Sequence, residues 1–521
     1  MTWRPQYRSS KFRHVFGKAA TKENCYDGVP ITHSVHDNHL CAVNPRFIAV
    51  ITECAGGGAF LVLSINHTGK VDPHHPRISG HRGNVLDIKW NPFNDFCIAS
   101  CSEDTTVKIW DIPKHGVMKN ITVPLKELQG HSRRVGLIEW HPTASNILFS
   151  TGYDYQVMVW NLNTPELVIK NPVRSIKIHT DVVLSMSFNT DGSRIATSCK
   201  DKKIRIIDPR TGALLQETNT KTHRASKVMF LGNLKMLLRM GESRVLEQSA
   251  KSPEDLSQPS FLEDLDGSSG VLFPFYDPDT HMLYIAGKGD GNIRYYEISS
   301  EKPYVHYLTE YRSLLPQKGM GVMPKRGLDV CSCEVFRFYR LVTTKSLIEP
   351  LSMIVPRRSE SYQEDIYPMT AGKEPAMTAE EWLRGMDKGP VLVSLKPGVV
   401  TKVKLYEDEE PVKAPSVQLD TRRSQSRPGL QQLTFTEHQR NMDEERQEVK
   451  KEDRKEQNLT ETIANGQRDF TLCSPPKTEN ELLQMYYKQQ EEIRRLRELL
   501  CQRDVRIKQL ELEIKNVRNS R

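Results

Sequence analysis

Short apolar runs separated by polar turn residues follow one another through the first 345 residues. The runs are rich in Val, Ile, Phe and Tyr, and clusters of Gly, Asn, Asp and Pro divide them. This pattern is typical of β-strands, because strands are short and lack the 3.6-residue period of a helix. It predicts an all-β domain over residues 1–345.

An internal repeat organises these strands. Gly80–Pro92 returns as Gly130–Pro142, shifted by 50 residues at every position, and a third copy ending at Asp208 differs by one deletion. The first copy begins with Gly-His and ends with Trp-Asp. These ends, together with units of 47 to 50 residues, are typical of WD-repeat propeller blades, each of which is a four-stranded sheet.

Each repeat also places a His, a strand Ser or Thr, a turn Asp and a Trp at fixed spacing. In such blades these four side chains form one structural hydrogen-bonded chain. The two complete sets are His81, Ser100, Asp104 and Trp110, then His131, Ser150, Asp154 and Trp160. In the third copy Ile207 replaces the Trp, so this chain is one member short.

The spacing of the closing strands predicts seven blades. These strands lie at 59–65, Trp110, Trp160, Ile207, Tyr296 and 335–341. The gap of 89 residues between Ile207 and Tyr296 is about twice the repeat, so one more blade is expected there, opening near His223. Lys11–Phe16 is expected to pair with the last blade and close the ring.

Two appendages are expected between the blades and the C-terminal segment. Residues 346–400 mix Pro with apolar residues and include Trp382, which predicts an extension arm packed on the propeller. Residues 401–477 are charged and poor in apolar residues, a composition typical of a disordered linker.

Residues 478–518 show a heptad pattern that predicts an α-helical coiled coil. Nine of eleven seam positions are apolar or aromatic over about five heptads. The residues expected to make the oligomer contacts are Tyr486, Ile493, Leu496, Leu500, Arg506, Ile507, Leu510, Glu511 and Ile514. A single amphipathic helix lying on the propeller is the alternative, but the strict 3.5-residue period favours self-association.

Composition narrows the class of protein. Of the net charge of +8, +7 lies in residues 1–400, because residues 401–521 hold 24 basic and 23 acidic side chains. Ten scattered Cys do not form a disulfide framework, and no apolar leader or membrane span is found in the sequence. We therefore expect a protein of the cytosol or nucleus.

No motif predicts an enzyme, a cofactor, a metal site or a nucleic-acid site. The chain lacks a P-loop and a His-Glu-x-x-His motif. Gly287–Gly291 is Gly-rich but lies between two strands, which favours a hairpin over a nucleotide loop. Cys331 and Cys333 have the wrong spacing for a zinc knuckle.

Longer motifs resemble those of the coronins, most closely the class II coronins of the A type. They are Ser10–Gly17, Glu53–Val62, Asp266–Pro274, Met323–Val330, Val355–Pro368 and Lys477–Met485. The resemblance implies a non-enzymatic scaffold and regulator that associates with actin filaments and actin regulators in the cytoplasm. It also implies a parallel homo-oligomeric coil. Arg506 and Glu511 fit a trimer-favouring pattern, whereas Ile at a with Leu at d favours a dimer; of the two states, the trimer is modestly favoured.

Two departures from the family pattern affect these expectations. Coronins that bind filaments strongly tend to have an Arg shortly after the Cys-Tyr step, where this chain has Pro30. The nearby Arg4, Arg8, Lys11 and Arg13 are generic candidates for an actin-binding site. In the fifth blade, about 220–262, Val245–Leu256 lacks an alternating closing strand, which suggests a variant reading frame and a poorly formed blade.

The alternative function is an adaptor subunit of a nuclear corepressor-type or signalling complex, with weak or no direct filament binding and a nuclear pool. A propeller fold alone does not decide between this role and the cytoskeletal one.

Overall fold

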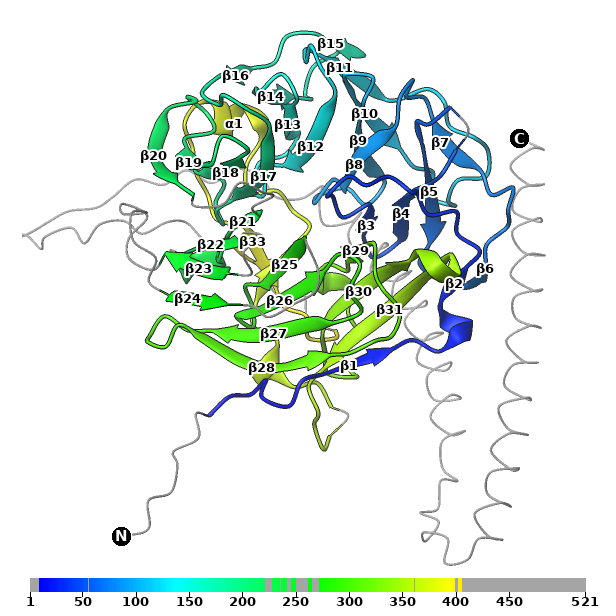
Figure 1. Cartoon of the computed structure of the whole chain (residues 1–521), viewed down its shortest axis with the longest axis vertical. Helices are drawn as coiled ribbons and strands as arrows, with labels where there is room; N and C mark the ends of the chain where they lie inside the picture. Colours follow the sequence, from blue (N-terminus) through cyan, green and yellow to red (C-terminus); the bar gives the residue numbers. More distant parts are fainter. Residues whose placement is uncertain are drawn as a thin grey trace, which may run out of the picture. The chain divides into compact units, whose positions relative to one another are not determined.

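The computed structural model describes residues 9–54, 56–220, 227–234, 236–240, 245–249, 261–264, 271–359, 361–398 and 402–404. Within these residues the strands form seven sheets of at least four strands and one sheet of three. Figure 1 shows the larger sheets following one another around a central axis in chain order. This arrangement leaves few exposed sheet edges.

The first four sheets follow one another along the chain, except that β15 (Val168–Ile169) of the second sheet lies after the first three strands of the third. The first sheet holds β3 (Cys41–Val43), β4 (Phe47–Ile51), β5 (Ala59–Ser64) and β7 (Arg77–Ser79). The second holds β8 (Val85–Trp90), β9 (Cys97–Ser102), β10 (Thr106–Asp111), β11 (Lys126–Gln129) and, parallel to β11, β15 (Val168–Ile169). The third holds β12 (Val135–Trp140), β13 (Ile147–Gly152), β14 (Val157–Asn161) and β16 (Arg174–Ile176). The fourth holds β17 (Val183–Phe188), β18 (Ile195–Cys199), β19 (Lys203–Ile207) and β20 (Leu214–Asn219).

The fifth and sixth sheets continue this order, and the seventh combines strands from both ends of the domain. The fifth holds β21 (Lys227–Phe230), β22 (Leu237–Met240), β23 (Val245–Ser249) and β24 (Phe261–Asp264). The sixth holds β25 (Leu272–Asp277), β26 (Met282–Gly287), β27 (Ile293–Ile298) and β28 (Val305–Tyr311). The seventh holds β29 (Gly319–Val322), β30 (Glu334–Val342), β31 (Leu347–Ile354), β1 (Phe16–Ala19), β2 (Tyr26–Asp27) and β6 (Gly69–Lys70).

The remaining elements are short. The three-stranded sheet is formed by β32 (Thr370–Ala371), β33 (Val391–Val393) and β34 (Lys402–Lys404), and α1 (Ala379–Leu383) lies between its first two strands in the chain. Single 3-10 turns lie at Lys22–Asn24, Gly232–Leu234, Lys325–Gly327, Thr343–Lys345 and Glu364–Ile366.

The hydrophobic core lies between neighbouring sheets. One cluster joins Leu86 and Ala99 of the second sheet to Val135 and Leu148 of the third. Because each sheet is apolar on both faces, each one stabilises the next, as expected for stacked structural repeats.

The N-terminal segment pairs with the last sheet, but it does so later in the chain than predicted. β1 begins at Phe16 and runs antiparallel to β31, whereas residues 11–14 form a turn. Phe12 and Val15, which are three residues apart, are both buried in one cluster, and the Val15 N–H donates to the Phe12 carbonyl at 3.1 Å. A turn buries this pair together, whereas neighbouring strand positions alternate between faces.

Two further predictions about strands are wrong. Val245–Ser249 forms β23, which pairs with both β22 and β24, so the fifth sheet does have a third strand. This is possible because backbone pairing does not require an alternating sequence. The segment 335–341 lies in the second strand of the seventh sheet, and β31 is the third. The predicted boundary at 345/346 therefore divides one sheet.

Candidate functional site

The four predicted groups of the second sheet lie within hydrogen-bond distance of one another. The Trp110 Nε1–H donates to Ser100 Oγ at 2.8 Å, and Ser100 Oγ lies 2.7 Å from His81 Nε2. The other ring nitrogen, Nδ1, lies 2.9 Å from the Asp104 carboxylate. Although burial opposes it, the hydrogen bond from His81 holds the pKa of the Asp104 carboxyl well below its usual value. This hydrogen-bonded chain connects four segments: the residues just after β7, strand β9, strand β10, and the turn between β9 and β10.

The third sheet repeats this geometry. Trp160 Nε1–H donates to Ser150 Oγ at 2.8 Å, and Ser150 Oγ lies 2.8 Å from His131 Nε2. His131 Nδ1 lies 3.0 Å from the Asp154 carboxylate, which also accepts from the Ser132 N–H. All four side chains are buried or nearly so, and the bonds satisfy groups that would otherwise be costly to bury.

The fourth sheet has only part of this chain of hydrogen-bonded side chains. His179 Nε2 lies 2.9 Å from Thr197 Oγ1, but His179 Nδ1 is buried and has no hydrogen-bond partner among the described residues. The Asp201 carboxylate instead accepts from Arg205 at 2.7 Å and from Thr180 at 3.0 Å. Ile207 occupies the place of the Trp and packs into the core. Burial lowers the pKa of His179 to about 4, so the ring is neutral.

A second substitution accompanies the loss of the Trp. A Cβ added to Gly80 or to Gly130 would lie 2.8 Å from Cη2 of the Trp in its own sheet. The equivalent position in the fourth sheet is Ile178, which packs against the cluster that contains Ile207. The Gly before the His therefore leaves room for the Trp ring, and in the fourth sheet both the Gly and the Trp are absent.

The structure describes two of the four basic candidates near the N-terminus. Lys11 and Arg13 are both exposed in the turn before β1, and Lys11 Nζ donates to the Asp365 carbonyl at 3.0 Å. Arg4 and Arg8 lie outside the described residues. Pro30 is half-buried, and its carbonyl accepts from the Glu53 N–H at 2.9 Å.

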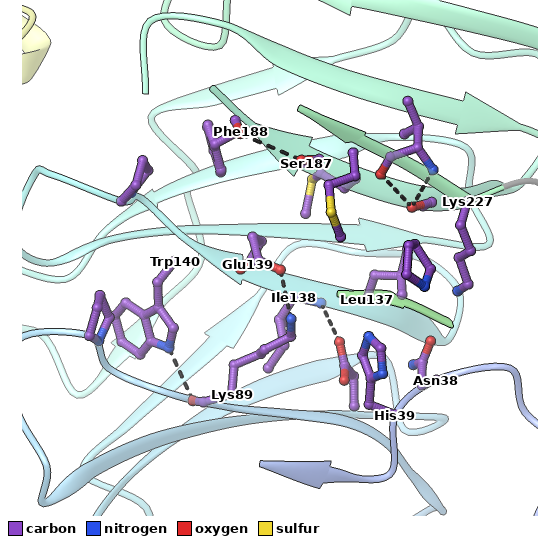
Figure 2. Close-up of a pocket in the computed structure, with 18 of the residues that line it drawn as sticks. Asn38, His39, Lys89, Leu137, Ile138, Glu139, Trp140, Ser187, Phe188 and Lys227 are labelled. Carbon is purple, nitrogen blue, oxygen red and sulfur yellow. Dashed lines mark hydrogen bonds and ion pairs between the residues drawn. The ribbon is translucent and has the colours of Figure 1, made fainter. Parts of the chain in front are cut away.

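A cavity of about 440 Å³ lies along the central axis, between the first strands of five sheets. Figure 2 shows Asn38 and Lys227 toward one end of it and Trp140 and Phe188 toward the other. The Asn38 side chain donates to the Leu86 and Gly136 carbonyls, both at 2.8 Å, and so joins β8 to the start of β12.

Charged groups line this cavity. Lys89 Nζ lies 2.8 Å from Glu139 Oε2, and both Glu139 and Asp87 raise the pKa of Lys89, against the effect of burial. Asp87 Oδ2 accepts from the Ile138 N–H at 3.1 Å, and burial raises the pKa of Asp87 to about 6. Lys227 Nζ donates to the Asp37 carbonyl at 2.9 Å, and burial lowers the pKa of Lys227 to about 8. These cavity charges were not predicted from the sequence.

A second cavity of about 550 Å³ adjoins the first, and Thr370–Gly372 and Pro390 line part of it. Lys373, one residue further along, lies 3.1 Å from the Asp95 carboxylate, which also makes a bidentate pair with Arg326. One buried carboxylate thus joins the second sheet, the seventh sheet and the segment after β31. This segment lies at the end of the axis opposite to Asn38.

Trp382 anchors the same segment to the third and fourth sheets. It is fully buried, and its ring lies 5.0 Å from that of His141 and 6.1 Å from that of Phe149. The Arg210 guanidinium lies 5.2 Å from the Trp382 ring centroid and pairs with Asp387. The apolar content of the segment predicted that it would pack on the propeller. Its capping box, Thr378 with Glu381, could also have indicated α1, but the partners of Trp382 are distant in sequence.

The predicted coiled-coil residues from Tyr486 to Ile514 lie outside the described residues. No helix among the described residues is long and apolar enough to cross a membrane. In this same part of the chain, no group of three or more His, Cys, Asp or Glu residues is placed to hold a metal ion.

The comparisons with known proteins agree with the repeated sheets and their hydrogen-bonded chains. Residues 74–111, 122–161 and 170–208 match the family described as "WD domain, G-beta repeat", and residues 348–390 match "Type of WD40 repeat". Residues 5–70 match "Domain of unknown function (DUF1899)". The fold is thus a WD40 β-propeller.

Three related proteins define its family. Human Coronin-2A is 63% identical over 528 residues, covering 99% of each chain, and human Coronin-2B is 57% identical over 522 residues, covering 100% of this chain and 98% of the relative. The crystal structure of the WD40 domain from Toxoplasma gondii coronin superposes with a TM-score of 0.68 at 28% identity, covering 74% of this chain and 98% of that one. The chain belongs to the coronin family and, within it, to the class II coronins of the A type.

Proposed function

We propose that this coronin is a non-enzymatic scaffold that associates with actin filaments and actin regulators in the cytoplasm. The observation that supports this most strongly is its relation to Coronin-2A, which extends over 99% of both chains. The basic excess of residues 1–400 favours an acidic partner such as a filament. No described contact favours the nuclear or signalling alternative.

The proposed architecture has four parts. A seven-bladed propeller, one blade for each large sheet, extends to Ile354 at the end of β31. The segment from Val355 to about residue 400 is the arm, which is held by Trp382 and Lys373. Residues 401–477 form the linker, and residues 478–518 form the coiled coil.

The coil would give the scaffold its avidity. A homo-oligomer, for which Arg506 and Glu511 favour three chains, would present several propellers to one filament. Weak individual contacts then become effective, because each further contact is intramolecular. The heptad pattern of residues 478–518 supports this step.

The turn before β1 is the proposed filament contact among the described residues. Lys11 and Arg13 are exposed there, and the undescribed Arg4 and Arg8 precede them closely in the chain. Lys11→Glu/Arg13→Glu, tested in the full chain, should therefore reduce binding at low salt. The matched control is Lys114→Glu/Lys119→Glu, which reverses two exposed charges after β10.

Filament co-sedimentation tests the proposal directly. The full chain should pellet with filaments at low salt, a chain ending at Lys477 should pellet less, and the Lys11/Arg13 variant should pellet less than its control. Absence of pelleting by the full chain and by the shortened chain would contradict direct actin binding. The mass of the assembly in solution, with and without residues 478–521, tests the coil independently.

A further inference from the structure

Three loops meet where the first strands of the sheets begin, at one end of the central axis. They are 33–39 before β3, 288–292 between β26 and β27, and 312–318 before β29. The Gly289 N–H donates to the Gln317 carbonyl at 2.8 Å, and the Met320 N–H donates to the His39 carbonyl at 3.0 Å. We call these loops, together with Lys227, the channel mouth.

Lys288 holds the first of these loops in place. Its ammonium donates to the Val35 carbonyl at 2.9 Å, to the His36 carbonyl at 3.0 Å and to Asp37 Oδ1 at 2.7 Å. All three hydrogens of the ammonium are thereby used. Lys288 is therefore a positioning residue, and the Asp37 carboxylate is occupied by it.

Two other ammonium groups at the mouth differ from Lys288. Lys227 Nζ donates to two backbone carbonyls among the described residues, that of Asp37 at 2.9 Å and that of Leu184 at 3.5 Å. Within the described residues, neither Lys227 nor Lys318 forms an ion pair. The neighbouring Glu53 carboxylate already accepts from the His33 N–H at 2.8 Å.

The electrostatic state of these two lysines agrees with this geometry. Burial lowers the pKa of Lys227 to about 8, although Asp37 and Asp87 oppose the shift. Burial and the Lys288 charge also lower the pKa of Lys318. A carboxylate that approached either ammonium would replace the hydration that each has lost, so it would be bound more strongly than at an open surface.

Apolar side chains stand on the same loops. Val35 is 87% exposed and Leu314 is 101% exposed, so both project fully into solvent. Exposed apolar side chains next to partly buried charges are typical of an interface, in which apolar contacts exclude water from the charged ones.

We propose that the channel mouth is a docking site for an acidic segment of a partner protein. Lys227 and Lys318 pair with its carboxylates, and Val35 and Leu314 contact its apolar side chains. Figure 2 shows Lys227 and Asn38 together at this end of the cavity, away from Trp140. The opposite end is the one next to Thr370–Gly372 and Lys373, so a partner segment would enter from the mouth. This site is separate from the turn at Lys11 and does not depend on actin binding.

A labelled peptide tests the proposal in the full chain. The probe is a fluorescein-labelled ten-residue peptide of alternating Glu and Leu, and its partner has Gln in place of Glu. Anisotropy at low salt should show binding of the Glu peptide, weakened at least tenfold in the Gln peptide. Lys318→Glu should weaken Glu-peptide binding at least tenfold, whereas Lys114→Glu, which reverses an exposed charge elsewhere, should change it less than twofold.

A second variant and a second probe complete the test. Lys227→Gln, with its fold checked by near-ultraviolet circular dichroism, should also weaken Glu-peptide binding. Equal effects of Lys318→Glu and Lys114→Glu, equal binding of the two peptides, or no binding would overturn the proposal. So would binding to phosphatidylserine vesicles, abolished by Lys318→Glu, without peptide binding. Filament pelleting of Lys318→Glu that equals that of the unaltered chain would support a site distinct from the filament contact.

Discussion

The third and fourth sheets have the same strand order, yet they solve the same packing problem in two ways. The third closes its His-Ser-Asp chain with Trp160, which requires Gly130 next to it. The fourth has Ile207 and Ile178 at these places, and its Asp201 carboxylate accepts a hydrogen bond from Arg205. A polar chain and an apolar pair are thus alternative solutions, and each needs its members to change together.

The strongest test of this comparison exchanges one solution for the other in the third sheet. Gly130→Ile alone should destabilise the protein by at least about 3 kcal/mol, because its side chain would overlap Trp160. The double variant Gly130→Ile/Trp160→Ile should lose less free energy of unfolding than the two single variants lose together, by about 1–3 kcal/mol. Urea unfolding of the full chain measures all three. Strict additivity would show that the two positions are independent.

A smaller effect should separate the two sheets at their hydroxyl groups. Ser150→Ala removes a partner from both Trp160 and His131, so we expect a loss of about 2–3 kcal/mol. Thr197→Val removes a partner from His179 alone, and the expected loss is about 1 kcal/mol. The urea unfolding midpoints of the two variants measure these losses. Equal losses in the two variants would contradict a shared hydroxyl in the third sheet.

The last expected effect is a pH dependence that arises from His179 of the fourth sheet. The folded-state pKa of His179 is lowered to about 4, whereas an unfolded His titrates near pH 6.5. Its stabilising contribution is therefore complete above about pH 6.5 and is lost as the pH falls toward 4. Between pH 7 and pH 5 this amounts to about 2 kcal/mol.

The control for this effect is a second histidine substitution. His179→Asn should lose about 2 kcal/mol less stability than the unaltered chain between pH 7 and pH 5. His115→Asn, at an exposed site, should behave as the unaltered chain does. Thermal melts at the two pH values measure the stability of both variants. If His179→Asn loses as much stability between pH 7 and pH 5 as the unaltered chain does, His179 is not a cause of the pH dependence.

The sequence predicted the parts of the molecule that repeat. His81 and His131 share a register because the spacing of the blades is regular, so one alignment located both sets of four residues. The four-residue sets of the second and third sheets needed no other information.

Features that depend on distant partners were not predictable in this way. The pairing of Arg210 with Asp387 and the shared Asp95 carboxylate join segments from different sheets. Pro350 made β31 resemble an arm, but a strand accepts a Pro where its N–H is not needed. Its carbonyl still accepts from the Ala20 N–H at 2.8 Å. Lys227 and Lys318 were not singled out, because a linear pattern does not show which charges form ion pairs among the described residues.

The pairing of β1 with β31 has a consequence for synthesis. About 330 residues separate these strands, so at about 5–20 residues per second the ribosome needs roughly 15–65 s between them. During that time β1 has no β31 to pair with, and its unpaired backbone can join another chain. The nascent protein is therefore most exposed to misassembly through β1 before its last blade emerges.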